Sequence, residues 1–163
     1  NNLRVVSNHH QLIYDTAIKM ILDKPIIGHG PKMFRELCAN EKYIINREIR
    51  VSNEISITNG CSTHPHNTYL QLLVETGIVG TVPVICLFFY LIYLAFRQIV
   101  SFVSLSEKYF LSDNSVVFMT VVIINLLPIV PSLNFFNNWI NIIYFLPLAL
   151  LLSSEKILKI KKL

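Results

Sequence analysis

Hydrophobic and polar positions follow two different patterns along this chain, and the pattern changes near residue 77. Before that point, "QLIYDTAIKMILDK" at 11–24 repeats apolar residues at helical spacing and stops before Pro25. The residues that share this apolar face are Ile13, Ala17, Met20 and Ile21. After that point, no residue from Ile78 to Phe96 carries a charge. We predict an amphipathic helix in the first stretch and a membrane-spanning helix in the second.

Two further apolar stretches follow, at about 115–130 and 139–152. No charged residue occurs from Asn114 to Ser154, a length that as helix is enough for two crossings of a hydrocarbon core of about 30 Å. Pro128, Pro131 and "SLNFFNN" predict a turn between the two stretches. We therefore expect three membrane helices in the C-terminal half.

These patterns predict an all-α polytopic membrane protein with two parts. Residues 1–76 form a mostly helical loop domain, in which 40–60 is an irregular loop or a short hairpin, and residues 77–163 form the membrane helices and a basic tail. Because the chain starts at Asn1 without a Met or a leader, we expect it to be the C-terminal part of a larger polytopic protein, or an incomplete sequence.

Composition and charge give this arrangement an orientation. The chain is 53% hydrophobic and only 15% charged, whereas soluble domains carry about 25% charged residues. The tail "EKILKIKKL" holds four lysines and is expected in the cytoplasm. Counting back through three crossings places residues 1–77 outside, in the periplasm or at the cell exterior. We therefore expect a multi-pass membrane protein whose first segment faces away from the cytoplasm.

Two cysteines lie in the part expected outside. Cys38 and Cys61 bracket a loop that an oxidising compartment would allow to close as a disulfide, stabilising the domain by about 3 kcal/mol. The alternative is two unrelated thiols.

The candidate chemistry lies in "CSTHPHNTYLQLLVETGIVGT", residues 61–81. Thr68 and Gln71 match a capping box, so a helix is expected to start near Asn67 or Thr68, with His66 at its N-terminus and Tyr69 on a neighbouring position of the same face. A helix N-terminus favours phosphate and lowers the pKa of a histidine, which keeps the imidazole neutral and basic. The alternative is that His66 only caps the helix or lies at the membrane interface.

Other titratable residues have plainer interpretations. His64 and His66, even with His9, His10 and His29 as partners, do not show a standard zinc-ligand spacing, so we predict no metal site. Glu75 lies near the expected membrane surface, where capping or pairing with another helix is favoured over catalysis.

Two motifs, taken together, point to a family. His66-Asn67, nine residues and then "GIVGT" read as H-N-x9-G-x-x-G-T, and "DKPIIGHGPKMF" contains P-x-x-G-x-G. This order resembles the O-antigen ligase and O-antigen polymerase superfamily over about residues 7–97. The resemblance implies a lipid-dependent glycosyltransferase that needs no metal, cofactor or nucleotide. It would move glycan from an undecaprenyl diphosphate-linked donor to an acceptor hydroxyl on lipid A–core or on another lipid-linked glycan, at the periplasmic face.

The resemblance also implies roles for residues. His66 would be the general base, Asn67 would orient it or contact the sugar, and arginines would stabilise the departing diphosphate. The family carries an arginine four residues before an aromatic, where this chain has His10, and Arg4 is out of register. Arg35 is our preferred phosphate contact, against the alternative of a solvated surface arginine. Further candidate substrate contacts are His64 and Tyr69, and Arg47 and Arg50 are interpreted as loop charges.

Two other functional classes compete with the transferase. A transporter or flippase component for lipid-linked sugars predicts ionisable residues inside the spans, and the three predicted spans have none. If the protein were a non-enzymatic envelope component, the H-N-x9-G-x-x-G-T pattern would be a coincidence. The expected partners are the lipid bilayer and lipid-linked glycans, with no nucleic acid. The residues fit a ligase and a polymerase equally.

Overall fold

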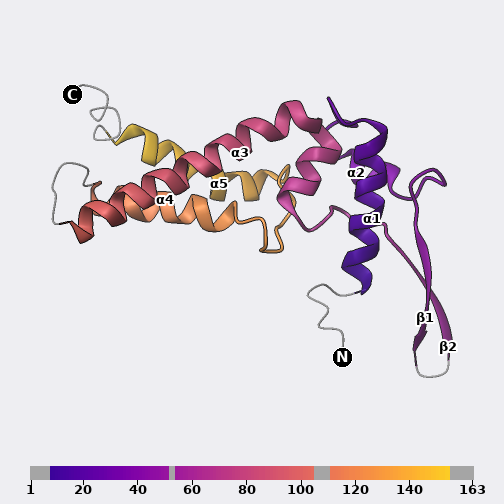
Figure 1. The fold of residues 1–163 in the computed structure, drawn as a ribbon. Helices are drawn as coiled ribbons and strands as arrows, with labels where there is room; N and C mark the ends of the chain where they lie inside the picture. The colour runs from indigo at the N-terminus through magenta and orange to yellow at the C-terminus, as the bar shows by residue number, and fades with distance from the viewer. Residues whose placement is uncertain (1–7, 52–53, 105–110, 155–163) are drawn as a thin grey trace. The chain divides into compact units, whose positions relative to one another are not determined.

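The computed structural model describes residues 8–51, 54–104 and 111–154. Along the chain its elements are α1 (Asn8–Asp23), α2 (Met33–Leu37), β1 (Asn46–Val51), β2 (Glu54–Asn59), α3 (Thr68–Val103), α4 (Asp113–Asn125) and α5 (Asn138–Ser153) (Figure 1). They form two compact units, here called the N-terminal unit (the chain up to Val82, with 131–136) and the C-terminal unit (83–130 and the chain from Asn137). The compact units divide after Val82, and the boundary after residue 76 between a loop domain and membrane helices stays a prediction.

The core of the N-terminal unit is built on the predicted apolar face of α1. Ile13, Ala17 and Met20 are fully buried, which confirms the helical spacing read from the sequence. They pack against Phe34 of α2, and Cys38, Tyr43 and Val74 complete the cluster. The helix ends at Asp23, two residues before the proline that the sequence gives as its stop.

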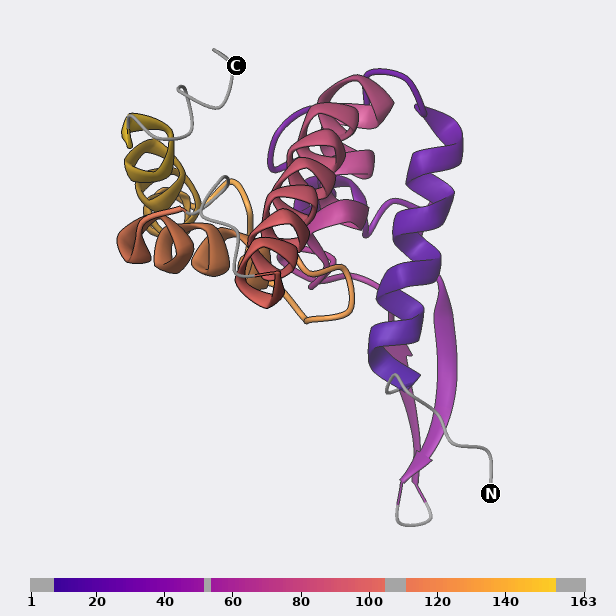
Figure 2. The same ribbon diagram turned by 60° about the vertical axis from the view of Figure 1, so that its left-hand side comes forward.

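A β-hairpin adds two strands to the mostly helical fold that the sequence predicts. Strands β1 and β2 pair antiparallel, with Asn46 opposite Asn59 and Val51 opposite Glu54. The hairpin was one of the two predictions for 40–60, and its cause is the alternation of apolar and polar residues in "IRVSNEISITN". Figures 1 and 2 both show the two strands side by side along their length.

Helix α3 contains a break at Gly77, whose backbone angles are φ 63° and ψ −165°. It is therefore two helices in succession, 68–76 and 78–103. Among the described residues, α3 is the one helix long and apolar enough to cross a membrane. Most of its apolar side chains are exposed, including Phe89, Phe96 and Phe102, so it is not a core helix of this chain.

In the C-terminal unit α4 and α5 pack together (Figure 2). Ser115 Oγ donates to Ser154 Oγ at 3.0 Å, so the start of α4 lies beside the end of α5. The sequence predicts 115–130 for the first of these helices, but α4 ends at Asn125, because the residue before Pro128 is disfavoured in a helical conformation. At 13 and 16 residues, α4 and α5 reach only about 20 and 24 Å at ~1.5 Å per residue. The predicted basic tail lies outside the described residues.

Candidate active site

The two sequence motifs meet at the break in α3. Because a new helix starts after Gly77, the first N–H groups of that helix have no partner within it. The N–H of Ile78 donates to the carbonyl of Pro25 at 2.9 Å, and the N–H of Val79 donates to that of Ile26 at 3.1 Å. The P-x-x-G-x-G loop therefore supplies the hydrogen bonds that the G-x-x-G-T helix lacks.

The same loop also binds the end of the preceding helix. The N–H of His29 donates to the carbonyl of Val74, and that of Gly30 to the carbonyl of Glu75, both at 2.8 Å. These bonds require glycine at Gly28, where an added Cβ would lie 2.5 Å from the backbone of Glu75. The motif glycines thus serve a close backbone approach between two distant segments.

Glu75 fixes this loop through its side chain. It is 1% exposed, and its carboxylate accepts hydrogen bonds from the N–H of Lys32 at 2.8 Å, the N–H of Phe34 at 3.4 Å and Gln71 Nε2 at 3.4 Å. Burial raises the pKa of this carboxyl above its usual value, against the lowering effect of these donors. Of the two interpretations, capping fits this geometry, because Lys32 and Phe34 are the N-cap and a first-turn residue of α2.

Asn67 is the residue that caps α3. Its Oδ1 accepts from the N–H of Tyr69 at 3.0 Å and from that of Leu70 at 3.1 Å. The predicted capping box is therefore wrong in its residues, since asparagine is an equal or better N-cap than threonine and lies one position earlier. Gln71, the other half of the predicted box, instead donates to Asn134 Oδ1 and accepts from the N–H of Phe135.

His66 stands directly before this cap, in a left-handed backbone conformation with φ 56°. A non-glycine residue in this region stores on the order of 1 kcal/mol or more of strain. The half-buried imidazole places Nε2 3.3 Å from Ser62 Oγ. Its ring centroid lies 4.2 Å from that of His64 and 5.4 Å from that of His10. The structure therefore brings a residue of α1 next to the predicted catalytic histidine.

This environment favours the neutral imidazole. Burial lowers the pKa of His66 below its ordinary value of 6.5, and His64, His10 and His9 lower it further because a charge on any of them disfavours a charge on His66. The group is therefore a free base at neutral pH. An imidazole that is neutral, half-exposed and within reach of a hydroxyl has the properties of a general base.

His64 has a different position. It is 8% exposed, Nδ1 lies 3.0 Å from Thr63 Oγ1, and Nε2 lies 3.2 Å from the carbonyl of Ser132. The N–H of Ser132 in turn donates to the carbonyl of His66. With both ring nitrogens engaged, His64 fastens the 131–136 loop to the histidine segment, and its role as a substrate contact stays a prediction. Burial lowers the pKa of His64 as well.

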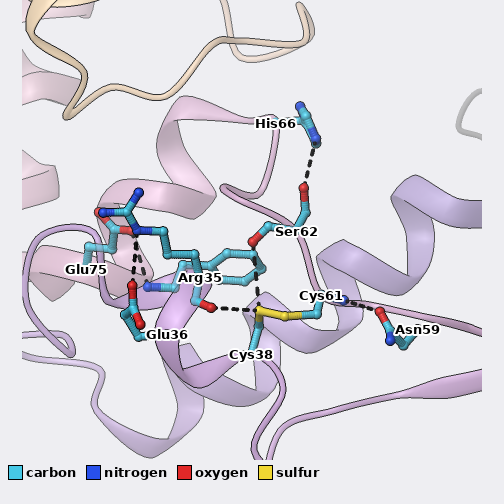
Figure 3. Close-up of a disulfide and its surroundings, with 9 residues drawn as sticks. Arg35, Glu36, Cys38, Asn59, Cys61, Ser62, His66 and Glu75 are labelled. Atoms are coloured by element: carbon cyan, nitrogen blue, oxygen red, sulfur yellow. Dashed lines mark hydrogen bonds and ion pairs between the residues drawn. A yellow bond between two sulfur atoms is a disulfide. The ribbon is translucent and has the colours of Figure 1, made fainter.

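The remaining predicted contacts lie at varying distances from His66. Arg35 Nε pairs with Glu36 at 3.3 Å, and Figure 3 draws its side chain on the Glu75 side, away from His66. The side chain of Tyr69 is half-buried in the first turn of α3. Arg4 lies outside the described residues, and Arg47 and Arg50 lie on β1 of the hairpin.

Among the described residues, no group of three or more His, Cys, Asp or Glu side chains is arranged to hold a metal ion.

A disulfide between Cys38 and Cys61 anchors the segment that leads to His66 (Figure 3). Cys38 belongs to the buried core, and its sulfur lies 3.8 Å from the carbonyl of Ser62. The bond therefore ties Ser62, the hydroxyl partner of His66, to the core around α2. Ser62 and the 131–136 loop were not among the predicted site residues, because only the three-dimensional contact reveals them.

Comparison with known proteins agrees with the motifs. A family model described as O-antigen ligase matches residues 9–85. Two curated proteins named "Putative polysaccharide ligase" are similar to this chain. The one from Rickettsia conorii is 27% identical over 131 residues, which cover 80% of this chain, and the one from Rickettsia felis is 31% identical over 80 residues, which cover 48%.

The chain spans only part of these relatives, 28% of the first and 18% of the second. No solved structure matches it. The matched region contains both glycine motifs, the capped start of α3 and the histidine cluster. Through residues 9–85, this chain is therefore similar to the O-antigen ligase family.

Proposed function

We propose that this chain carries the acceptor-activating site of a membrane glycosyltransferase of the polysaccharide ligase type. The observation that carries the proposal is the environment of His66, a neutral imidazole that lies directly before a capped helix and contacts a hydroxyl. The names of the two relatives support the same class of reaction. The proposed donor is an undecaprenyl diphosphate-linked oligosaccharide, and the acceptor is lipid A–core or a second lipid-linked glycan.

The proposed step is a direct displacement at the anomeric carbon of the donor sugar. The acceptor hydroxyl forms the new glycosidic bond, its proton passes to His66, and the bond from the sugar to the diphosphate breaks. The contact from Ser62 Oγ to Nε2 indicates that a hydroxyl approaches this nitrogen at hydrogen-bonding distance. General-base assistance of this kind contributes about 10²–10⁴-fold in rate.

The leaving diphosphate needs cationic or N–H partners. His10 lies 5.4 Å from His66 between ring centroids, and the nearer His64 has both ring nitrogens engaged, so we assign His10 to the phosphate nearest the reacting carbon. Arg35 is exposed and pairs with the neighbouring surface carboxylate of Glu36. We assign it to a more distant part of the donor.

The membrane supplies the donor in this proposal. Because the glycan is carried on a lipid, the site must lie close to a bilayer, and α3 begins its apolar run directly after the motif. By the positive-inside rule, the N-terminal unit faces away from the cytoplasm. The resemblance to O-antigen ligases implies that the membrane is the bacterial inner (cell) membrane and that this unit faces the periplasm. For α4 and α5 to cross as well, flanking residues or a locally thinner bilayer must make up their short length.

The test is the variant His66→Asn, assayed with purified protein, lipid-linked oligosaccharide and acceptor. Asparagine tolerates a positive φ, so the backbone is preserved while the base is lost. Transfer is expected to fall about 100-fold or more. His9→Asn is the matched control, since His9 is exposed and next to His10, and it should transfer nearly as well as the parent.

Near-normal transfer by His66→Asn would refute the base role. Because donor and acceptor are both supplied in solution, a flippase component would show no transfer even in the parent protein. Offering lipid A–core and lipid-linked repeats separately distinguishes a ligase from a polymerase.

A further inference from the structure

An apolar patch surrounds the point where the loop meets the break in α3. Ile26 and Ile27, at the tip of the P-x-x-G-x-G loop, are 64% and 72% exposed, and Leu22 at the end of α1 is exposed as well. The hydrogen bonds from Ile78 and Val79 place this tip beside the first turn of the apolar helix. Ile78, Val79 and Val82 of that turn are also exposed. We call these six residues the loop patch.

We propose that the loop patch is embedded in the hydrocarbon of the membrane leaflet next to the N-terminal unit. The patch is continuous with α3, which is long and apolar enough to cross a membrane and whose apolar side chains are mostly exposed. Hydrocarbon that surrounds the start of this helix would reach Ile26 and Ile27 too, because their backbone is bonded to it. The proposal rests on α3 crossing the membrane and not on the transfer reaction.

Several backbone groups of the loop already have hydrogen-bond partners within the protein, as hydrocarbon surroundings require. Unpaired backbone groups are costly in hydrocarbon, so irregular loops normally stay out of it. Here the carbonyls of Pro25 and Ile26 accept from the N–H groups that the helix break would leave unpaired. Pro25 has no N–H of its own, and the carbonyl of Lys24 accepts from Gly28. These loop carbonyls and the first N–H groups of the new helix therefore satisfy each other.

Charges flank the patch where lipid headgroups would lie. Lys24 precedes the two isoleucines and Lys32 follows the glycines, and both side chains are exposed. Lysines can bury their alkyl stems at an interface while the ammonium group stays with the phosphates. An apolar tip between two lysines thus complements an anionic leaflet surface.

Spin-label accessibility in bilayer nanodiscs tests the proposal. A nitroxide is attached to Ile27→Cys in a Cys86→Ser background, with the disulfide intact, and its collision rates with oxygen and with a water-soluble nickel chelate are measured. Ile57→Cys on β2 is the matched control, since Ile57 is 70% exposed on the hairpin. The label at position 27 should show a ratio of oxygen to nickel accessibility several-fold above that at position 57.

Two results would overturn the proposal. High nickel accessibility at position 27 would place the tip in water. Low accessibility to both reagents would mean that protein, and not lipid, covers the patch. A second label at Ile26→Cys guards against a local perturbation and should behave like the first. Since neither measurement depends on glycan transfer, failure of the proposed function would leave this result unchanged.

Discussion

In the N-terminal unit polar side chains bond to partners far along the chain, whereas in the C-terminal unit they bond mainly within one helical turn. His64 reaches Ser132, Gln71 reaches Asn134, and the Glu75 carboxylate reaches the N–H of Lys32. In the C-terminal unit the hydroxyls of Ser104 and Thr120 and the amide of Asn125 each bond to the carbonyl four residues before.

The difference indicates that the two units have different surroundings, with an apolar one around the C-terminal unit. Side chains that bond to their own helix need no outside partner, which suits an apolar surrounding. The apolar residues agree, since Phe89, Phe96 and Trp139 are exposed in the C-terminal unit while Phe34 and Met20 are buried in the N-terminal unit. The N-terminal unit therefore holds itself together, and the C-terminal unit depends on what surrounds it.

Of the variants that test this difference between the units, Gly77→Ala should have the largest effect on the stability of the N-terminal unit. The backbone at Gly77 lies in a region accessible essentially only to glycine, which costs about 1–3 kcal/mol for alanine, and the new Cβ would lie 2.3 Å from the carbonyl oxygen of Ile26. We expect a loss of about 3 kcal/mol or more in the N-terminal unit. Hydrogen exchange of the α1 amides measures it.

Val79→Ala, an exposed position two residues later, is the control and should leave exchange nearly unchanged. Equal protection in Gly77→Ala and the parent would mean that the loop contact does not hold the unit together.

Removal of the disulfide should have the next largest effect. The double variant Cys38→Ser and Cys61→Ser releases a loop of 23 residues, which costs about 3 kcal/mol on the loop-entropy model. Denaturant unfolding followed by exchange in α1 and α2 should show the loss, while fluorescence of Trp139 in the C-terminal unit should not change its midpoint. Cys86→Ser, at the exposed free thiol, is the control. A parallel loss in both units would contradict their separate stabilisation.

A smaller effect is expected on the pH dependence of transfer. A base must be deprotonated, so activity should rise with pH through the pKa of His66, which lies below 6.5. His10→Gln removes one neighbour that lowers this pKa, so the acid limb should move to higher pH by less than about one unit. His9→Gln should move it less, since His9 has the smaller influence. If the acid limb of His10→Gln stays in place or moves to lower pH, His10 does not lower the pKa of His66.

The smallest effect is expected for Ser115→Ala in the C-terminal unit. The bond from Ser115 to Ser154 joins α4 and α5, and such bonds between membrane helices contribute about 0.6 kcal/mol on average. Unfolding in detergent, followed by the fluorescence of Trp139, should show a loss of that order. A loss as large as that from the missing disulfide would mean that polar contacts stabilise both units alike.

The sequence predicts elements whose cause is local. The buried face of α1, its end before Pro25, and the apolar helix from Ile78 follow from periodicity and composition. The end of α4 was placed too late because the apolar stretch continues past Asn125, although Pro128 already disfavours helix there.

The site was harder to predict because its contacts are distant in sequence. His66 and Cys38–Cys61 were singled out from residue type and position, but the neighbours of His66 come from α1 and from the segment before it. No periodicity connects His64 with Ser132 or Lys32 with Glu75. The spacing of Thr68 to Gln71 fits a known motif and predicts Thr68 as the cap, yet Asn67 has the better position.

The pairing of Pro25 and Ile26 with Ile78 and Val79 also implies an order of synthesis. The carbonyls of Pro25 and Ile26 leave the ribosome well before the amides of Ile78 and Val79. The hydrogen-bond acceptors for the first turn of the apolar helix are therefore already synthesised when that helix emerges. A circular permutant that places residues 8–60 after α3 would reverse that order. In that permutant the apolar helix would be synthesised while the N–H groups of Ile78 and Val79 still lacked their acceptors.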